Sequence, residues 1–279
     1  MATTTSLNIA FIGGGNMASA LIAGLLAKGQ PSSLLHVVET DAEKLADFQA
    51  KGLNTYNANN IDDTKHAIEK ADVVVLAVKP QVIKDVLLLV KDSWGEQVVI
   101  SIAAGIGTDS LAEWLGPQVK LVRAMPNTPA MIQMGATGLY ATAGVSEAEQ
   151  QLAQQVMSAA GLVLWVDDEE LLHAVTAISG SAPAYFFYML ENMIATGEKL
   201  GLTQTQATAL AMQTALGSAQ MALTSHDTPA ELRRKVTSPN GTTQAAIEVM
   251  DAKKMHQIIA DAMLACEQRS RELSQAFGK

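Results

Sequence analysis

Cysteine and charged residues are scarce in this sequence of 279 residues. Its single cysteine, Cys266, excludes an intrachain disulfide and any metal centre built from several thiolates, which is typical of a reducing compartment. Charged residues make up 17% of the chain and hydrophobic residues 48%. A chain of this length and composition is expected to bury a substantial core, in one large domain or two ordinary ones.

Positive charge is also scarce, because the formal net charge is -9 and no basic stripe runs along the sequence. Proteins that bind nucleic acids normally carry such a stripe, so no nucleic-acid partner is expected. The one basic triplet, Arg233-Arg234-Lys235, is interpreted as a solvated helix face.

Three further patterns are missing. The five histidines show no metal-ligand spacing, so no metal is expected, and no G-x-S-x-G nucleophile elbow occurs. No apolar run is long enough to cross a bilayer, and residues 1–6 lack the charged and apolar regions of a signal peptide. A cytoplasmic protein with no membrane partner is therefore expected.

The clearest positive signal is a glycine-rich turn near the start of the chain. An apolar run over residues 7–12 ends in the spacing Gly13-x-Gly15-x-x-Ala18 and continues as a helix. This spacing fits the dinucleotide fingerprint, in which glycines make the turn and let the backbone approach a pyrophosphate at the helix N-terminus. The alternative is an ordinary glycine-rich loop.

An acidic residue follows at the distance that this fingerprint requires. Glu39 ends a second predicted strand, 21 positions beyond Ala18. A dinucleotide fold places a carboxylate there on the adenosine ribose hydroxyls. The alternative is an exposed loop glutamate.

Strands and helices alternate over the first part of the chain, which predicts an α/β Rossmann-type domain with a parallel sheet. Strands are expected at 7–12, 34–38, 53–56, 73–78, 98–102, 119–123, 138–141 and 161–166, with helices after the first turn and at 41–51, 61–70, 81–90, 111–115 and 147–160. Several strands end in candidate ligand residues: Gly13, Glu39, Ala77 with Val78, Gly105 and Asn127. Ligands bind beyond the carboxyl edge of such a sheet, so these residues are expected to line one crevice.

The pattern changes after residue 166, where only helical segments follow. We therefore predict a dinucleotide-binding domain over 1–165 and an all-α domain over 166–279. The predicted helix at 206–223 is apolar on nearly every face, which is typical of a core or an interface. The second domain is thus expected to bury this surface in a homodimer.

One loop in the helical part is rich in hydroxyl and amide groups. It runs from Arg234 to Thr243 and contains Thr237-Ser238-Pro239-Asn240-Gly241. Loop amides, hydroxyls and a helix N-terminus together form a neutral site for a small anion such as a carboxylate. An ordinary capped turn uses the same residue types and remains the alternative.

Six blocks, taken in order, resemble the pyrroline-5-carboxylate reductase family over nearly the whole chain. They are residues 11–17 (FIGGGNM), 77–80 (AVKP), 101–105 (SIAAG), 123–129 (RAMPNTP), 179–185 (SGSAPAY) and 237–243 (TSPNGTT). The resemblance implies reduction of 1-pyrroline-5-carboxylate to L-proline by NADPH or NADH, the last step of proline biosynthesis. It also implies a Rossmann domain followed by a helical dimerisation domain, and dimers that often assemble into larger rings.

The resemblance assigns site residues by position. Gly13, Gly15, Asn16 and Met17 would hold the pyrophosphate, and Ala77, Lys79, Pro80, Ala103, Ala104 and Gly105 would line the cofactor groove, beside the strand-end residues Val78, Glu39 and Asn127. Ser238, Gly241, Thr242 and Thr243 would hold the substrate carboxylate and ring nitrogen, with Val236 against the ring. Thr243 is the predicted catalytic residue, and either it or water delivers the proton. In family dimers this loop meets the Rossmann domain of the partner.

Two residues depart from the family pattern. Asn240 stands where glycine is usual, and because asparagine tolerates positive φ, the turn is expected to persist. Ala182 stands where glycine or serine is common, which would narrow the space near the nicotinamide.

Cofactor choice and two rival functions remain open at this stage. Glu39 at the second strand end, with no arginine before Arg123, predicts good use of NADH, although family members commonly take NADPH. The rivals are a reductase of another cyclic imine or small oxo acid, and a non-catalytic dinucleotide sensor whose helical half binds a protein.

Overall fold

The computed structural model describes residues 7–116 and 118–277. The chain divides into two compact units. The first unit runs to Ser181 and resumes at Cys266, and the second unit is Ala182–Ala265.

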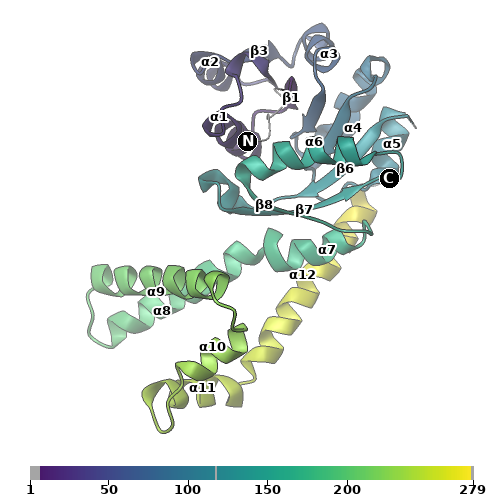
Figure 1. Cartoon of the computed structure of the whole chain (residues 1–279). Helices are drawn as coiled ribbons and strands as arrows, with labels where there is room; N and C mark the ends of the chain where they lie inside the picture. Colours follow the sequence, from purple (N-terminus) through teal and green to yellow (C-terminus); the bar gives the residue numbers. More distant parts are fainter. Residues whose placement is uncertain (1–6, 117, 278–279) are drawn as a thin grey trace. The chain divides into compact units, whose positions relative to one another are not determined.

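An eight-stranded sheet forms the centre of the first unit (Figure 1). Its strands are β1 (Ile9–Ile12), β2 (Leu35–Glu39), β3 (Asn54–Asn57), β4 (Val73–Leu76), β5 (Val98–Ser101), β6 (Lys120–Met125), β7 (Gly135–Ala141) and β8 (Gly161–Trp165). The order is β3-β2-β1-β4-β5-β6-β7-β8. Strands β1 to β6 are parallel, β7 runs antiparallel to β6, and β8 is parallel to β7. The predicted Rossmann-type α/β fold is confirmed.

Helices cover both faces of this sheet. They are α1 (Asn16–Ala27), α2 (Ala42–Ala50), α3 (Ile61–Glu69), α4 (Pro80–Leu89), α5 (Thr108–Leu115), α6 (Glu147–Met157) and α7 (Leu171–Val175). Successive strand residues point to opposite faces, so β1, β2, β4, β5 and β6 contribute to two cores. One core joins the sheet to α1, α2 and α6, and the other joins it to α3, α4 and α5. This double burial explains why β1, β4 and β5 are continuous apolar runs rather than alternating ones.

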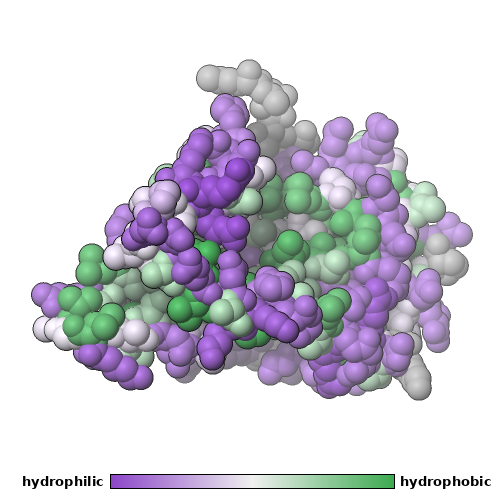
Figure 2. All heavy atoms as spheres, turned by 90° about the horizontal axis from the view of Figure 1, so that it is seen from below, coloured by the Kyte–Doolittle hydropathy of each residue, from purple (hydrophilic) through white to green (hydrophobic). Residues whose placement is uncertain are grey.

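The second unit is helical. It contains α8 (Ala182–Lys199), α9 (Gln204–Thr224), α10 (Pro229–Lys235), α11 (Thr242–Ala252) and the first part of α12 (Met255–Phe277), whose last turns belong to the first unit. Only Ala207 and Ala211 of α9 are buried, while Leu210, Leu216 and Leu223 are more than half exposed. Hydrophobic side chains also gather on the surface seen in Figure 2. This exposure of apolar surface is typical of an interface.

The predicted domain boundary at 165/166 falls where the strands end, directly after β8. The compact units instead divide after Ser181. The reason is that α7 and the π-helical turn Thr176–Gly180 pack on β7, so this stretch of helix belongs with the sheet.

Among the helices of the described chain, none combines the length and apolar character that crossing a bilayer requires.

Candidate functional site

The glycine-rich turn lies between β1 and α1, at the carboxyl edge of the sheet. Gly13 has a φ of +102°, and a Cβ there would lie 2.7 Å from the Ala77 carbonyl oxygen. Its N–H donates to the Val38 carbonyl at 2.8 Å. Both the backbone conformation and the close approach of β4 therefore require glycine at this position.

Gly15 is a glycine for a different reason. It is the N-cap of α1, its φ is -71°, and a Cβ there would meet nothing within 4 Å. Packing within the protein therefore does not require glycine here, whereas close approach of a ligand to the N-terminus of α1 would. Asn16 and Met17 follow as the first residues of α1, at the positive end of the helix dipole.

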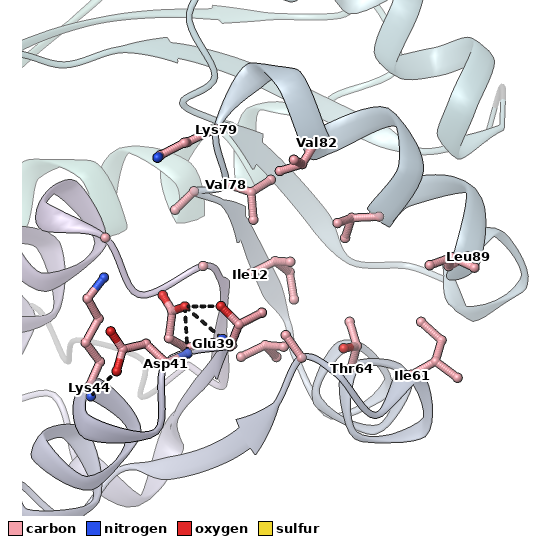
Figure 3. Close-up of a pocket in the computed structure, with 17 residues that line it drawn as sticks. Ile12, Glu39, Asp41, Lys44, Ile61, Thr64, Val78, Lys79, Val82 and Leu89 are labelled. Atoms are coloured by element: carbon pink, nitrogen blue, oxygen red, sulfur yellow. Dashed lines mark hydrogen bonds between the residues drawn. The ribbon is translucent and has the colours of Figure 1, made fainter.

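A cavity of about 550 Å³ opens beside this turn (Figure 3). It is lined by residues from the ends of β1, β2 and β4 and from α2, α3 and α4: Ile12, Gly13, Gly15, Val38, Glu39, Thr40, Asp41, Lys44, Ala58, Ile61, Thr64, Ala77, Val78, Lys79, Val82, Val86 and Leu89. Charged side chains line one part and aliphatic side chains the other, as Figure 3 shows for Glu39, Asp41 and Lys44 against Val82 and Leu89. The site lies where the strand order reverses between β1 and β4, which is the ligand position of this fold.

The Glu39 carboxylate is held by hydrogen bonds on both oxygens. Oε2 accepts from the Gly14 N–H at 2.8 Å, and Oε1 accepts from the Thr40 N–H at 2.7 Å and the Asp41 N–H at 3.2 Å. Partial burial would raise the pKa of Glu39, but these backbone donors and the Thr40 hydroxyl outweigh it and lower that pKa. Glu39 is therefore a fixed anion in the cavity.

The structure brings together six of the predicted cofactor residues in the cavity: Gly13, Gly15, Glu39, Ala77, Val78 and Lys79. Pro80 begins α4 directly after Lys79. Ala103, Ala104 and Gly105 form the turn after β5, outside the cavity lining. Gly105 has a φ of +76°, and a Cβ there would lie 3.1 Å from Phe277 Cδ2 of α12.

Asn127 follows β6, also outside the cavity lining. Its side chain is bonded to the protein on both sides: Nδ2 donates to the Ser179 carbonyl at 3.1 Å, and Oδ1 accepts from the Ala136 N–H at 2.9 Å.

Sequence reasoning missed the aliphatic wall of the cavity. Val82, Val86 and Leu89 lie on one face of α4, while Ile83 and Leu87 on another face are buried in the core. The spacing of four and three residues between Val82, Val86 and Leu89 could have revealed this wall. A helix packed on a core needs one apolar stripe, and α4 carries a second one. Lys44 was also missed, since a lysine in the first turns of α2 resembles any solvated helix residue.

The predicted substrate loop lies in the second unit, between α10 and α11. Val236 ends α10 and is 61% exposed, Gly241 is the N-cap of α11, and Thr242 and Thr243 are its first two residues. The Gly241 N–H donates to the Ser238 carbonyl at 3.0 Å. The structure thus places Ser238, Gly241, Thr242 and Thr243 at the N-terminus of α11, while Val236 directly follows α10.

Asn240 adopts a φ of +56° in this loop, so the expectation that asparagine preserves the turn is confirmed. Its N–H donates to Gln244 Oε1 at 2.7 Å.

In the ranges 7–116 and 118–277, no group of three or more His, Cys, Asp or Glu side chains is placed to hold a metal ion.

Two family models match the chain. Residues 169–273 match a model described as "pyrroline-5-carboxylate reductase dimerisation". Residues 8–105 match a model described as "NADP oxidoreductase coenzyme F420-dependent". A pyrroline-5-carboxylate reductase of Pseudomonas aeruginosa is 48% identical over 272 residues, which cover 97% of this chain and 98% of the relative. The Escherichia coli K12 protein of the same name is 34% identical over 270 residues, 96% and 98% of the two chains.

Solved structures agree with this relation. The pyrroline-5-carboxylate reductase of Coxiella burnetii superposes with a TM-score of 0.91 at 41% identity, over 97% of this chain and 99% of that one. The Plasmodium falciparum enzyme with NADP bound gives a TM-score of 0.85 at 25% identity, over 96% and 98%. Whole-chain identity and whole-chain fold agreement lead to one conclusion: the chain belongs to the pyrroline-5-carboxylate reductase family.

Proposed function

We propose that the chain uses a reduced nicotinamide dinucleotide to convert 1-pyrroline-5-carboxylate to L-proline, the final step of proline biosynthesis. The observation that carries this proposal is the 48% identity with a curated pyrroline-5-carboxylate reductase over nearly the full length of both chains. The cavity at the reversal point of the Rossmann-type sheet supports it, because this is where such folds bind dinucleotides.

The cavity fits the adenosine half of the cofactor. Glu39 would accept from the ribose hydroxyls, the aliphatic side chains of α4 would contact the adenine, and the N-terminus of α1 would face the pyrophosphate. We assign cofactor binding to Gly13, Gly15, Asn16, Met17, Glu39, Ala77, Val78, Lys79, Pro80, Ala103, Ala104 and Gly105. Asn127 also lies at the carboxyl edge, where its side chain is hydrogen-bonded to Ser179 and Ala136.

We infer that NADH is used well. A fixed carboxylate at the end of β2 repels the 2′-phosphate that distinguishes NADPH. Lys44 lines the same part of the cavity and offers one cation to such a phosphate, so NADPH remains a substrate in this proposal.

The substrate loop supplies neutral groups for a small amino-acid-like anion. Hydroxyls of Ser238, Thr242 and Thr243 and the N-terminus of α11 would bind the carboxylate and the ring nitrogen, with Val236 against the ring. When bound, the dinucleotide supplies a hydride to the imine carbon. A protonated cyclic imine carries its own electrophilic activation. These residues therefore mainly need to hold the imine carbon at the position where it can accept the hydride from the nicotinamide. Thr243 would hydrogen-bond the ring nitrogen.

We also propose that the chain acts as a homodimer through its helical part and that these dimers can assemble into a larger ring. The match of residues 169–273 to a dimerisation model and the exposed apolar surface of α9 support the dimer. In this arrangement the loop at 238–243 serves the Rossmann unit of the partner copy.

The purified chain is expected to oxidise NADH or NADPH when given pyrroline-5-carboxylate. Replacing Thr243 with alanine is expected to lower kcat/KM for the imine at least about tenfold, because a hydrogen bond to the reacting ring is lost. Steady-state kinetics measures both, with Ser33→Ala, a change at an exposed residue outside the site and the proposed interface, as the control.

Three outcomes would contradict these assignments. Dinucleotide binding without turnover of any imine would favour the sensor, and turnover of another cyclic imine or oxo acid in preference to pyrroline-5-carboxylate would change the substrate. Unaltered kinetics in Thr243→Ala would remove Thr243 from the site.

A further inference from the structure

Asn127 connects two segments that are far apart in sequence. It follows β6, and only 9% of the residue is exposed. Its Nδ2 donates to the Ser179 carbonyl in the π-helical turn, and its Oδ1 accepts from the Ala136 N–H of β7. Because a buried amide satisfies its hydrogen-bonding groups within the protein, this side chain fixes both segments relative to β6.

The π-helical turn needs an external donor at this carbonyl. In a continuous α-helix the Ser179 carbonyl would accept from the N–H four residues later, but that residue is Pro183, which has no N–H. The chain instead forms the wider turn, in which the Ser181 N–H donates to the Thr176 carbonyl at 2.8 Å. Asn127 supplies the donor that Pro183 cannot.

Two other contacts hold the same three residues, 179–181. A Cβ at Gly180 would lie 2.6 Å from Met125 Cε, so Gly180 packs tightly against the end of β6. Cys266 Sγ donates to Ser181 Oγ at 3.2 Å. Residues 179–181 are therefore held by contacts to β6 and α12 in addition to the hydrogen bonds within the π-helical turn. Wide turns of this kind occur frequently at functional sites.

The Asn127 clamp consists of the Asn127 side-chain amide, the Ser179 carbonyl and the Ala136 N–H. It lies on the side of the sheet edge where the reacting end of the cofactor would bind. The adenosine cavity lies at β1 and β2, and a dinucleotide crosses the reversal point toward β4, β5 and β6. Asn127 lies at the carboxyl end of β6, so it belongs to the nicotinamide side of the edge.

We propose that Asn127 is a positioning residue for hydride transfer, acting through the Ser179 carbonyl to fix the backbone of residues 179–181 beside the nicotinamide site. The inference rests on the proposed reductase function. It differs from direct cofactor binding, because both ends of the Asn127 amide are bonded to the protein.

The test replaces one atom of the clamp. Asn127→Asp keeps the size and the acceptor for Ala136 but places an oxygen opposite the Ser179 carbonyl. The expected result is a fall of at least about tenfold in kcat/KM for pyrroline-5-carboxylate, since small misplacements of reacting groups are costly. Dinucleotide affinity, measured by calorimetry, should change less than about twofold, because the adenosine cavity is untouched. The primary deuterium isotope effect on kcat from 4-deuterated NADH should rise as hydride transfer becomes slower.

Asn54 provides a matched control. It lies in β3, and its Nδ2 donates to the Ser33 and Leu35 carbonyls at 2.7 and 3.3 Å, so it too clamps backbone with an amide. Asn54→Asp should leave kcat/KM and the isotope effect unchanged. If Asn127→Asp does not fold, as judged by thermal melting, Asn127→Ala removes the same bonds without adding charge and takes its place.

Unaltered turnover and isotope effect in the folded Asn127 variant would overturn the inference. So would an equal loss of dinucleotide affinity, which indicates direct contact, or an equal loss in Asn54→Asp, which indicates a general effect on the fold. Failure of the unmodified chain to turn over pyrroline-5-carboxylate would contradict the proposed function instead.

Discussion

Glu39 is held as an anion by its own backbone surroundings. Donors from the turn after β1 and from the start of α2 converge on its two oxygens and lower its pKa. A carboxylate that accepts from Gly14 also helps to fix the glycine-rich turn. In the proposed function, the same residue would fix the turn that faces the pyrophosphate and would place negative charge where the two nicotinamide dinucleotides differ.

Replacing Glu39 with glutamine should shift cofactor use toward NADPH. Removing the negative charge relieves its repulsion of a 2′-phosphate, and the ratio of kcat/KM for NADPH to that for NADH should rise at least about tenfold, equivalent to ~1.4 kcal/mol. Steady-state kinetics with each cofactor measures this ratio. Asp41→Asn neutralises another carboxylate of the cavity and keeps an N-cap for α2, so it should shift the ratio much less. A ratio equal to that of the unmodified chain would show that Glu39 does not face the ribose.

Three residues other than glycine have positive φ in the described chain, and the sequence predicts this conformation for only one of them. The value at Asn240 was predictable, because the family pattern has glycine there and asparagine tolerates that backbone region. Gln133 and Lys254 also have positive φ, at +56° and +54°. Neither residue type favours this region, so their conformations come from the surrounding fold rather than from local preference.

Elements differed in how far the sequence predicted them. All eight strands were predictable. Strands β1, β4 and β5 are buried on both faces and are short apolar runs between helices, whereas β3 has the polar sequence NTYN and β8 is only half-buried. The stretch from Glu169 to Ile178 reads as one helix, but the structure has α7 followed by a π-helical turn. Pro183 is a visible signal of disruption. The donor that makes the wider turn possible, Asn127, lies 52 residues away from Ser179 and no local pattern reveals it.

The last turns of α12 are joined to α7 through a buried histidine. His173 is 3% exposed, and its Nδ1 lies 2.8 Å from the Ser270 hydroxyl. Burial lowers the pKa of His173, as do Arg123 and Arg271, against the opposing effect of Glu170 and Glu267. The contact between the two helices therefore disfavours the protonated form of this imidazole.

The lowered pKa of His173 predicts loss of stability in acid. Above a pH of about 6.5 neither the folded nor the unfolded state protonates His173, so it contributes no pH dependence. As the pH falls below that value, the unfolded state takes up a proton that the folded state resists, and stability falls until the pH passes the lowered folded-state pKa. Each pH unit between the two pKa values lowers the free energy of unfolding by about 1.4 kcal/mol. Each kcal/mol lost lowers Tm by ~2–4 °C. His36, whose pKa is lowered by burial and then by Lys70 and His66, acts in the same direction.

His173→Gln should reduce the fall in Tm between pH 7.5 and pH 5.0, even if its Tm at pH 7.5 is lower because a buried contact is changed. Differential scanning calorimetry at several pH values measures the slope. The control is His256→Gln, an exposed histidine at the start of the same helix, which should leave the slope unchanged. Parallel curves for the unmodified chain and His173→Gln would assign the acid sensitivity to other groups.

At the scale of the whole molecule, the two units differ in how they bury apolar surface. The first unit encloses two cores, one on each face of its sheet. In the second unit, α8 exposes Phe186, Phe187 and Tyr188 by more than 60% each, and α8 and α12 line an apolar groove of about 910 Å³. A unit of this size has too little core to leave such surface in water. A second copy of the chain, related by a twofold axis, is the partner that the family's dimerisation model implies.

A charge introduced into α9 should therefore dissociate the proposed dimer and lower its activity in parallel. Leu216 is 56% exposed in the single chain, and Leu216→Glu would bury a carboxylate in the proposed interface. The dimer dissociation constant should rise at least about a hundredfold, equivalent to ~2.7 kcal/mol, and turnover should fall with the dimer fraction because the loop at 238–243 would no longer reach a partner. Sedimentation velocity across a concentration series, with kinetics on the same samples, measures both quantities.

Leu88→Glu introduces the same charge at an exposed leucine of α4, beside the cavity lining rather than in it, and should leave both unchanged. Dimers that persist in Leu216→Glu would remove α9 from the interface, and full activity in its monomers would show that each chain contains a complete site.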